Sequence, residues 1–229
     1  MREHTYPFLP DLKALLERQF SAFFAPIALD SGIIVRALER FSACLSNIGG
    51  KYYDSSLSIE DFSHSDKYAT FLYYLSNSAY QASNLTLATQ SYYLNKILHS
   101  IDVFYEVALP ATLLLTHPLG SVLGRAKYGE YLCIYQNCTI GGDTKNGIIY
   151  YPTLGNGIAM YAGSKIIGNC MIGDNVIFGA NAFILNLDVP SDSIVVGSYP
   201  HHRILKSTHN VISEIFGNPA LSQAKEIET

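Results

Sequence analysis

Charged side chains are scarce in this sequence, and the positive ones form no cluster. Of its 229 residues 15% are charged, against about 25% in an average soluble domain. Fifteen basic side chains face nineteen acidic ones, which leaves a formal net charge of −4 at pH 7. Binding to the phosphate backbone of a nucleic acid requires clustered Lys and Arg side chains, so we expect no nucleic-acid partner. With 48% apolar residues, the chain is expected to be globular rather than disordered.

A long hydrophobic run is also missing. The longest apolar stretch, Val107 to Leu115, falls well short of the roughly 20 residues that a membrane-spanning helix needs. Residues 1–20 place charges and prolines where a signal peptide has its apolar centre. We therefore predict a cytoplasmic protein without a membrane span.

Cysteines are few, and their spacing is not that of a metal or redox site. There are four, with no CxxC pair among them. In the cytoplasm such thiols stay reduced, and we expect them to fill small spaces in the core. No metal is predicted. The four are Cys44, Cys133, Cys138 and Cys170.

Residues 1–100 have the hydrophobic periodicity of amphipathic helices. Apolar residues recur at helical spacing from Leu12 to Phe20. Similar runs follow over residues 33–41, 68–81 and 85–99. Residues 54–65, which are rich in serine, are predicted as a loop. We predict an α-helical domain over residues 1–100.

Beyond residue 100 a six-residue period replaces the helical one. From Leu154 onward every sixth position holds a large apolar residue. These positions are Leu154, Met160, Ile166, Ile172, Phe178 and Ile184. A period of six fits neither a helix, whose faces recur at 3.6, nor a flat strand, whose faces recur at two. It fits a coil of short strands in which three hexapeptides form one turn of a triangular prism.

Two interruptions of the repeat are informative. The register shifts by one residue near residues 125–131, which predicts an irregular coil there. From Asp143 to Thr153 the repeat stops, and we predict a loop that leaves the prism, the kind of place where repeat proteins tend to carry function. The predicted fold class is α+β: a helical domain, a parallel β-helix over residues 101–206 with one extended loop, and a tail over residues 207–229.

This repeat resembles that of the hexapeptide acyltransferases, and within them the chain is most similar to the serine O-acetyltransferases. The similarity covers roughly residues 65–206. Its strongest segment, residues 138–182, agrees with the family in repeat phase, glycine positions and loop length, and residues 189–206 resemble the family's closing segment. The resemblance implies a left-handed β-helix, acetyl-CoA as co-substrate, and a homotrimer or a dimer of trimers.

Acetyl transfer from a thioester to a hydroxyl needs a base for the hydroxyl proton and a donor for the oxyanion. Of seven histidines only His117 lies within the coil that approaches the loop, and it matches the family's catalytic histidine in the motif Asp-His-x-x-Gly, with Gly120 in place. Asp102 matches the carboxylate that the family pairs with this histidine. The resemblance therefore implies a His117–Asp102 dyad. The alternative is a histidine packed at a coil corner and an aspartate that caps a helix.

The resemblance also implies a groove for the pantetheine arm of acetyl-CoA. Small residues let the arm approach the backbone, whose N–H groups would serve as oxyanion donors. The matching positions are Gly142, Ala162 and Ala180. Arg203 and Lys206 would meet the nucleotide phosphates. The alternative is that these positions hold small residues because the triangular coil needs them for its own packing.

Three positions depart from the family's pattern. Thr116 stands where the family has an aspartate, and Tyr150 and Tyr151 replace an Arg-His pair before proline. In serine acetyltransferases these positions hold the ammonium and carboxylate groups of the amino acid. Tyrosine rings and hydroxyls suit a neutral sugar instead, although loop tyrosines could also serve packing between subunits.

We therefore predict an acetyl-CoA-dependent O-acetyltransferase whose acceptor is a sugar hydroxyl in surface polysaccharide synthesis. The alternative is a serine O-acetyltransferase of cysteine biosynthesis. A zinc hydratase built on the same coil would need three imidazoles within the repeat, which holds only His117. A non-catalytic trimeric scaffold would leave Asp102 and His117 without a role.

Overall fold

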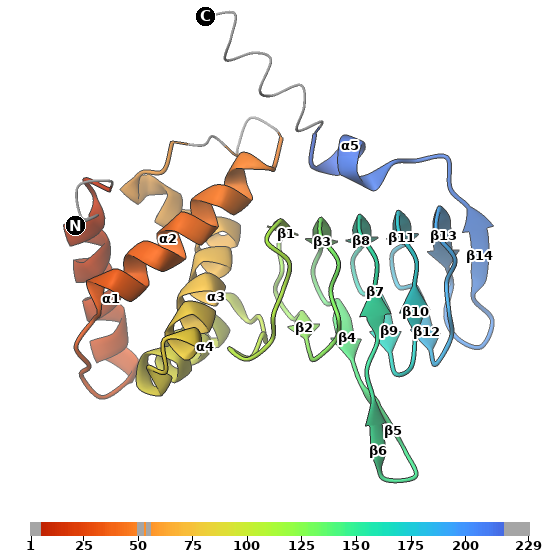
Figure 1. Ribbon diagram of the computed structural model, residues 1–229, viewed down its shortest axis with the longest axis horizontal. Coiled ribbons are helices and arrows are strands. Elements are labelled where there is room, and N and C mark those ends of the chain that lie inside the picture. The colour runs from red at the N-terminus through yellow and green to blue at the C-terminus, as the bar shows by residue number, and fades with distance from the viewer. Residues whose placement is uncertain (1–5, 50–52, 54–55, 218–229) are drawn as a thin grey trace, which may run out of the picture.

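Helices form one end of the molecule, and stacked coils of short strands form the rest (Figure 1). The structure is a computed structural model that describes residues 6–49, 53 and 56–217. The helices are α1 (Leu9–Phe23), α2 (Ser31–Ser46), the 3-10 helix η2 (Ile59–Ser63), α3 (Ser65–Gln81) and α4 (Leu85–His99). They confirm the predicted helical region. The predicted loop of residues 54–65, of which 54 and 55 lie outside the described residues, contains η2.

Short polar side chains fix the ends of these helices. At the start of α2, the Asp30 carboxylate accepts a hydrogen bond from the backbone N–H of Ile33 (3.1 Å), and at the start of α4 Asn84 does the same for Leu87 (3.1 Å). Helix α4 is capped by Ser100, the residue after its last one, whose backbone is left-handed (φ 54°). The chain leaves the helices at this residue and enters the first coil.

The strands form a parallel β-solenoid of about 5 turns with three faces. One face holds β1 (Leu113–Leu115), β3 (Leu132–Ile134), β8 (Ile158–Met160), β11 (Val176–Phe178) and β13 (Ser193–Val196). The second holds β2 (Val122–Leu123), β4 (Thr139–Gly141), β9 (Lys165–Ile167) and β12 (Phe183–Leu185), and the third holds β7 (Thr153–Leu154) and β10 (Met171–Ile172). Strand β14 (Arg203–Lys206) pairs antiparallel with β13 at the far end.

The register of the strands follows the six-residue period. Met160 pairs with Phe178, eighteen residues later, as the triangular prism predicts. Val122 pairs with Thr139, one residue short of that spacing, and Leu113 pairs with Leu132, one residue beyond it, so the first coils are irregular around the predicted register shift. The predicted fold class, helices followed by a β-helix with one extended loop, is confirmed.

The extended loop is itself structured. Strands β5 (Asp143–Lys145) and β6 (Ile148–Tyr150) pair antiparallel and form a hairpin that projects from the side of the solenoid (Figure 1). Its side chains include exposed apolar ones at Ile148 and Ile149. The hairpin therefore presents an apolar surface outside the prism.

The helices are joined to the first coil by buried hydrogen bonds. The Tyr73 hydroxyl donates to the carbonyl of Val107 (3.0 Å), and the Tyr74 hydroxyl donates to the carbonyl of Ala111 (3.1 Å). Both tyrosines lie on α3 and are almost fully buried. Helix α3 is thus fixed against the coil that leads into β1.

The start of the predicted tail packs back on the coils. A short helix, α5 (Val211–Ile215), begins where the backbone N–H of Val211 donates to the side chain of Asn175 (2.9 Å). The ring of Phe216 meets that of Tyr131 edge to face. The remainder of the predicted tail, residues 218–229, lies outside the described residues.

All four cysteines are free and buried, as predicted. Burial raises the pKa of the Cys133 thiol to about 12. The thiol is therefore held in its neutral form in the folded protein.

This burial predicts a loss of stability in alkali. An unfolded thiol ionises near pH 9 and the folded one near pH 12, so the contribution of Cys133 is complete below pH 9 and is lost as the pH rises toward 12. Urea unfolding should show that this thiol alone lowers the free energy of unfolding by about 2 kcal/mol between pH 8 and pH 10.5. The variant Cys133→Ala should show a shallower decline. An equal decline in both proteins would contradict the assignment.

Candidate active site

His117 lies on the turn that follows β1, next to the helices. Its imidazole is 74% exposed and its backbone is left-handed (φ 48°). A non-glycine residue in this conformation is strained by roughly 1–3 kcal/mol and persists only where its surroundings hold it. The proline that follows, Pro118, restricts the backbone further. Leu119 closes the turn by donating its backbone N–H to the His117 carbonyl (2.9 Å).

Asp66 is the carboxylate that contacts this turn. It lies in the first turn of α3, and its Oδ2 accepts a hydrogen bond from the backbone N–H of His117 (3.0 Å). The same oxygen is 3.8 Å from the imidazole Nδ1. Sequence reasoning gives no sign of Asp66, because the two residues are 51 positions apart and no motif connects them. The contact depends on the packing of α3 against the first coil.

The structure places Asp102 against helix α4. Tyr92 donates its hydroxyl to Asp102 Oδ1 (2.7 Å), and the Lys96 ammonium donates to Oδ2 (2.7 Å). The hydrogen bond to Asp102 is the main cause that raises the pKa of Lys96. Within the part of the chain that the structure describes, no hydrogen bond or ion pair joins Asp102 to His117. The dyad of these two residues stays a prediction.

The three predicted acceptor residues are not gathered at His117. Thr116 precedes it, but its side chain interacts with the buried thiol of Cys133. Tyr150 and Tyr151 lie at the base of the hairpin that follows β4, and their side chains are 38% and 39% exposed. Within one chain, the tyrosines and His117 therefore leave the prism at different corners.

A positively charged side chain, Arg125, lies beside the hairpin, and the sequence analysis does not single it out. The Arg125 guanidinium donates to the Glu106 carboxylate (2.7 Å), and Tyr151 is its second partner. Hydrogen bonding raises the pKa of Arg125, with Glu106 as the larger cause and Tyr151 as the smaller one. Tyr151 thus lies beside a guanidinium from the preceding coil, which is itself paired with the Glu106 carboxylate.

Two of the five predicted cofactor residues lie along the corner that His117 occupies. We call this the first corner: the turns at residues 116–121, 135–138, 161–164 and 179–182, which follow β1, β3, β8 and β11. Ala162 and Ala180 lie on it, and the carbonyl of Ala162 accepts from the backbone N–H of Asn181 (2.8 Å) in the next coil. Small side chains thus continue along the edge that starts at His117.

The other three predicted cofactor residues lie elsewhere. Arg203 and Lys206 are exposed on β14, where Arg203 pairs with Val196 of β13. Gly142 is exposed at the hairpin base, and a Cβ atom there would come within 2.9 Å of the Tyr151 ring. A larger residue at this position would displace the hairpin.

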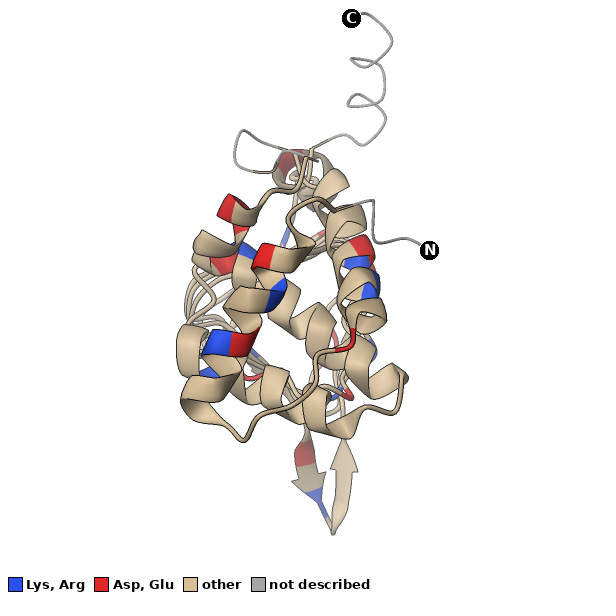
Figure 2. Cartoon of the chain, turned by 90° about the vertical axis from the view of Figure 1, so that its left-hand side faces the viewer, with Lys and Arg blue, Asp and Glu red and all other residues tan. Residues whose placement is uncertain are grey.

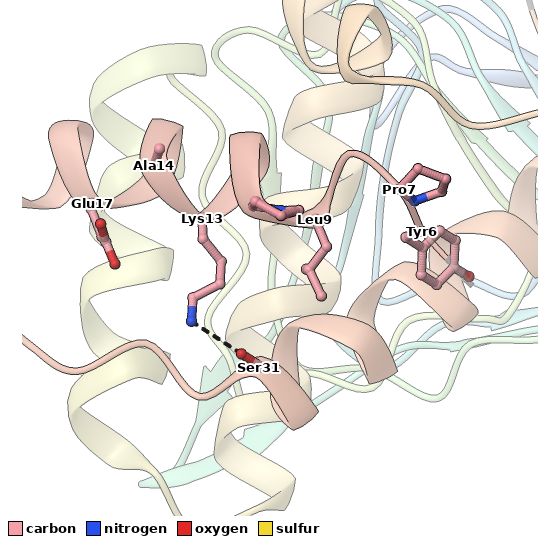
Figure 3. A pocket seen from close by; sticks show the side chains of 8 residues that line it. Tyr6, Pro7, Leu9, Lys13, Ala14, Glu17 and Ser31 are labelled. Carbon is pink, nitrogen blue, oxygen red and sulfur yellow. Dashed lines mark hydrogen bonds between the residues drawn. The ribbon is translucent and has the colours of Figure 1, made fainter. Parts of the chain in front are cut away.

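A cavity away from the coils lies in the helices, between α1 and the start of α2. Figure 3 shows this space, of about 680 Å³, with the Lys13 ammonium donating to the Ser31 hydroxyl (3.0 Å) and Glu17 at its rim. No predicted site residue lines it.

The surface charges and possible metal ligands define no other site. Figure 2 shows basic and acidic residues interspersed over the face that the helices form. Among the described residues, no group of three or more His, Cys, Asp and Glu side chains could hold a metal ion. No helix of the described ranges is long and apolar enough to cross a membrane.

Known proteins with similar sequences are serine acetyltransferases. The enzyme of Staphylococcus xylosus is 30% identical over 172 residues, which cover 72% of this chain and 78% of that protein. The enzyme of Helicobacter pylori strain 26695 is 31% identical over 132 residues, 57% of this chain and 77% of that protein. The enzyme of Synechococcus elongatus is 39% identical over 106 residues, which span only 43% of its length. No family model matches the sequence.

Solved structures give the same fold. The serine acetyltransferase of Vibrio cholerae superposes with a TM-score of 0.62 at 22% identity, covering 90% of this chain and 78% of that one. The serine acetyltransferase of Neisseria gonorrhoeae gives a TM-score of 0.62 at 20% identity, covering 88% and 76%. At these identities the superpositions establish the fold alone.

Helices packed on a hexapeptide-repeat β-solenoid, together with these relatives, define a left-handed β-helix acyltransferase. The chain belongs to the serine acetyltransferase family. The predicted sugar acceptor finds no support among these relatives, and the alternative, a serine O-acetyltransferase, fits them better.

Proposed function

We propose that this protein transfers the acetyl group of acetyl-CoA to the side-chain hydroxyl of L-serine. The observation that carries the proposal is the 30% identity to a serine acetyltransferase over 78% of its length. Structures with the same fold are described as complexes with CoA and with serine. The exposed imidazole on the turn after β1 supplies the group that such a reaction needs.

His117 is proposed as the general base. Its imidazole takes the proton of the serine hydroxyl as the oxygen attacks the thioester carbonyl, and a tetrahedral oxyanion forms. Backbone N–H groups near the first corner would stabilise the oxyanion. The intermediate collapses as the carbon–sulfur bond breaks, and the departing thiolate takes the proton from the imidazolium. The products are O-acetylserine and CoA, and His117 is again neutral.

The charge around Tyr151 favours an amino-acid acceptor over a neutral sugar. The argument for a sugar is that Thr116, Tyr150 and Tyr151 carry no charge that could hold a carboxylate. Arg125 lies outside the motif but supplies a guanidinium beside Tyr151, where an acceptor carboxylate would compete with Glu106 for it. Its planar guanidinium suits a carboxylate, which it can bind with two parallel hydrogen bonds.

A homotrimer would bring the two groups of residues together. His117, Ala162 and Ala180 lie on the first corner, whereas Tyr151 and Arg125 lie at the corner of the hairpin. A site that uses both groups needs the hairpin corner of one chain against the first corner of another. We propose that acetyl-CoA lies along this junction, with Gly142 at the hairpin base and Arg203 and Lys206 toward the phosphates. Pairing of trimers into hexamers stays a prediction.

The acceptor is tested by thiol release. Purified protein with acetyl-CoA should release free thiol when L-serine is added, and not when glucose, N-acetylglucosamine or an oligosaccharide is added. Release that depends on a sugar and not on serine would reject the proposal in favour of a sugar acceptor. Release with no acceptor would indicate only thioester hydrolysis, which rejects it as well.

Substituting Arg125 should weaken serine binding selectively. Arg125→Gln removes the charge next to Tyr151, so the KM for L-serine should rise roughly tenfold, while the KM for acetyl-CoA stays within about twofold. The matched control is Arg36→Gln, since Arg36 is an exposed arginine on α2 that hydrogen-bonds to Gln81. The control should leave both constants unchanged. An unchanged KM for serine in Arg125→Gln would show that its guanidinium does not meet the acceptor.

A further inference from the structure

The edge formed by the first corner ends, at the last coil, in a turn that carries two aromatic rings. This closing turn, residues 197–202, follows β13 as the turns of the first corner follow β1 to β11. The Ser198 hydroxyl donates to the carbonyl of Asn181, in the preceding turn of that corner (3.0 Å). The backbone N–H of Tyr199 donates to the carbonyl of Phe183 on β12 (2.8 Å). The closing turn therefore continues the first corner by one more coil.

The distance of the closing turn from His117 matches the length of the arm of acetyl-CoA. Strands β1 and β13 are four steps apart in their sheet, which at about 4.8 Å per step is about 19 Å. The arm has about thirteen bonds between its sulfur and the first phosphorus, so it spans about 16 Å when extended, at the roughly 1.2 Å per bond of an extended chain. With the thioester at His117, the nucleotide of acetyl-CoA would therefore lie at the closing turn.

Tyr199 and His202 present flat rings at this place. Their planes are nearly parallel, at 13°, and their centroids are 6.4 Å apart. The ring of Phe183 contacts that of Tyr199 at an angle of 67° and helps to fix it, yet Tyr199 remains 46% exposed. The buried Nδ1 of His202 has no hydrogen-bond partner among the described residues, so a ligand atom or a water is its missing partner. A fixed and exposed aromatic ring can stack on a planar ligand.

The charges that follow the rings suit phosphates. Arg203 and Lys206 begin and end β14, directly after the closing turn, and both side chains are exposed. In the part of the chain that the structure describes, no carboxylate pairs with either of them. A nucleotide carries the complementary groups, which are a flat base and negatively charged phosphates.

We propose that Tyr199 and His202 bind the adenine ring of acetyl-CoA by stacking, and that they set the preference for complete acetyl-CoA over a shorter thioester. This inference rests on the proposed function, in which the thioester lies at His117. Stacking on an aromatic side chain does not depend on the reaction at the other end of the donor. These two residues therefore act on donor binding and leave the chemical step unchanged.

Two donors separate the nucleotide from the arm. Acetyl-pantetheine carries the same thioester and arm as acetyl-CoA but has no nucleotide. Tyr199→Ala should raise the KM for acetyl-CoA roughly tenfold, with kcat and the kcat/KM for acetyl-pantetheine each within about twofold of the wild type. His202→Ala should have the same selective effect. Tyr199→Phe keeps the ring and should behave as the wild type.

Phe23 provides the matched control for the loss of an exposed ring. It is 50% exposed and lies at the end of α1, among the helices and away from the closing turn (Figure 1). Phe23→Ala should leave the KM for both donors unchanged. A rise in the KM for acetyl-CoA in this control, as large as in Tyr199→Ala, would mean that the loss of any exposed ring weakens the donor, and would reject the adenine site.

The 3′-phosphate separates the base from the charges. Acetyl-dephospho-CoA has the adenine ring but lacks this phosphate. Tyr199→Ala should weaken the binding of both nucleotide donors by the same factor, because both carry the base. Arg203→Gln should weaken acetyl-CoA more than acetyl-dephospho-CoA, if its guanidinium meets that phosphate. A loss in Tyr199→Ala that is confined to acetyl-CoA would assign this residue to the phosphate and reject stacking.

A binding measurement without turnover keeps this inference distinct from the proposed function. Isothermal titration calorimetry of the whole protein should show that CoA, and adenosine 3′,5′-bisphosphate alone, bind roughly tenfold more weakly to Tyr199→Ala and His202→Ala than to the wild type. If the wild type releases no thiol with serine, the proposed function fails, and the two titrations still decide whether these rings bind the nucleotide.

Two results would overturn the proposal. One is an unchanged affinity for CoA in both Tyr199→Ala and His202→Ala. The other is an equal loss with acetyl-CoA and acetyl-pantetheine, which would mean that the rings contact the arm or pack between subunits. Light scattering tells these last two apart, because only the loss of packing between subunits lowers the mass of the assembly.

Discussion

Replacing His117 by alanine should lower kcat/KM for acetyl transfer to L-serine roughly 10²–10⁴-fold, the usual contribution of a positioned general base. The imidazole is mostly exposed and packs against little, so its removal should not disturb the core. Alanine keeps the Cβ atom in the left-handed turn and so relieves no backbone strain, and the melting temperature should stay close to that of the wild type or fall slightly.

The controls for this variant follow from the same geometry. His117→Asn retains a residue type that tolerates the left-handed backbone but cannot serve as a base, so it should be as inactive as the alanine variant. His209→Ala changes an exposed histidine beside Glu214, outside the proposed site, and should retain full activity. Turnover at the wild-type rate in either His117 variant would remove this residue from the mechanism.

Replacing Phe178 by alanine should cost about 3–5 kcal/mol of unfolding free energy, the largest stability effect expected for one residue of the solenoid. Phe178 is fully buried, and its strand pairs with neighbours on both sides, at Met160 and at Val195. Truncation would leave a cavity inside the stack, between close-packed coils that cannot collapse into it.

The neighbouring residue Ile177 is the matched control for Phe178. It lies on the same strand but is partly exposed, so Ile177→Ala should cost clearly less in urea unfolding. Phe178→Leu keeps most of the buried volume, so its loss of unfolding free energy should lie between those of Phe178→Ala and Ile177→Ala. Equal losses for Phe178→Ala and Ile177→Ala would contradict the assignment of Phe178 to the core of the prism.

The fold could be predicted because a six-residue period constrains the whole coil. Once each hexapeptide is one side of a triangle, Leu154 must stack on Ile172, and the structure pairs these two residues. The hairpin could be located as an interruption of the repeat, but its strands could not, because Ile148 and Ile149 lie outside the prism and follow no period.

The site was less predictable because its contacts join distant parts of the chain. Asp66 reaches His117 only through the packing of α3, and Arg125 reaches Tyr151 only because a coil stacks beneath the hairpin. No sequence motif indicates either of these two contacts. Asp102 matches a family position, yet helix α4 holds its carboxylate with side chains outside that motif.

The most direct test of the proposed reaction is the identity of the acetylated product. Wild-type protein incubated with acetyl-CoA carrying a ¹³C-labelled acetyl group and with L-serine should form the ester carbonyl signal of O-acetylserine in a one-to-one ratio with free thiol, and His117→Ala should form neither. Thiol release without the serine ester, or the same ester in the His117 variant, would contradict a serine acetyltransferase that uses His117 as its base.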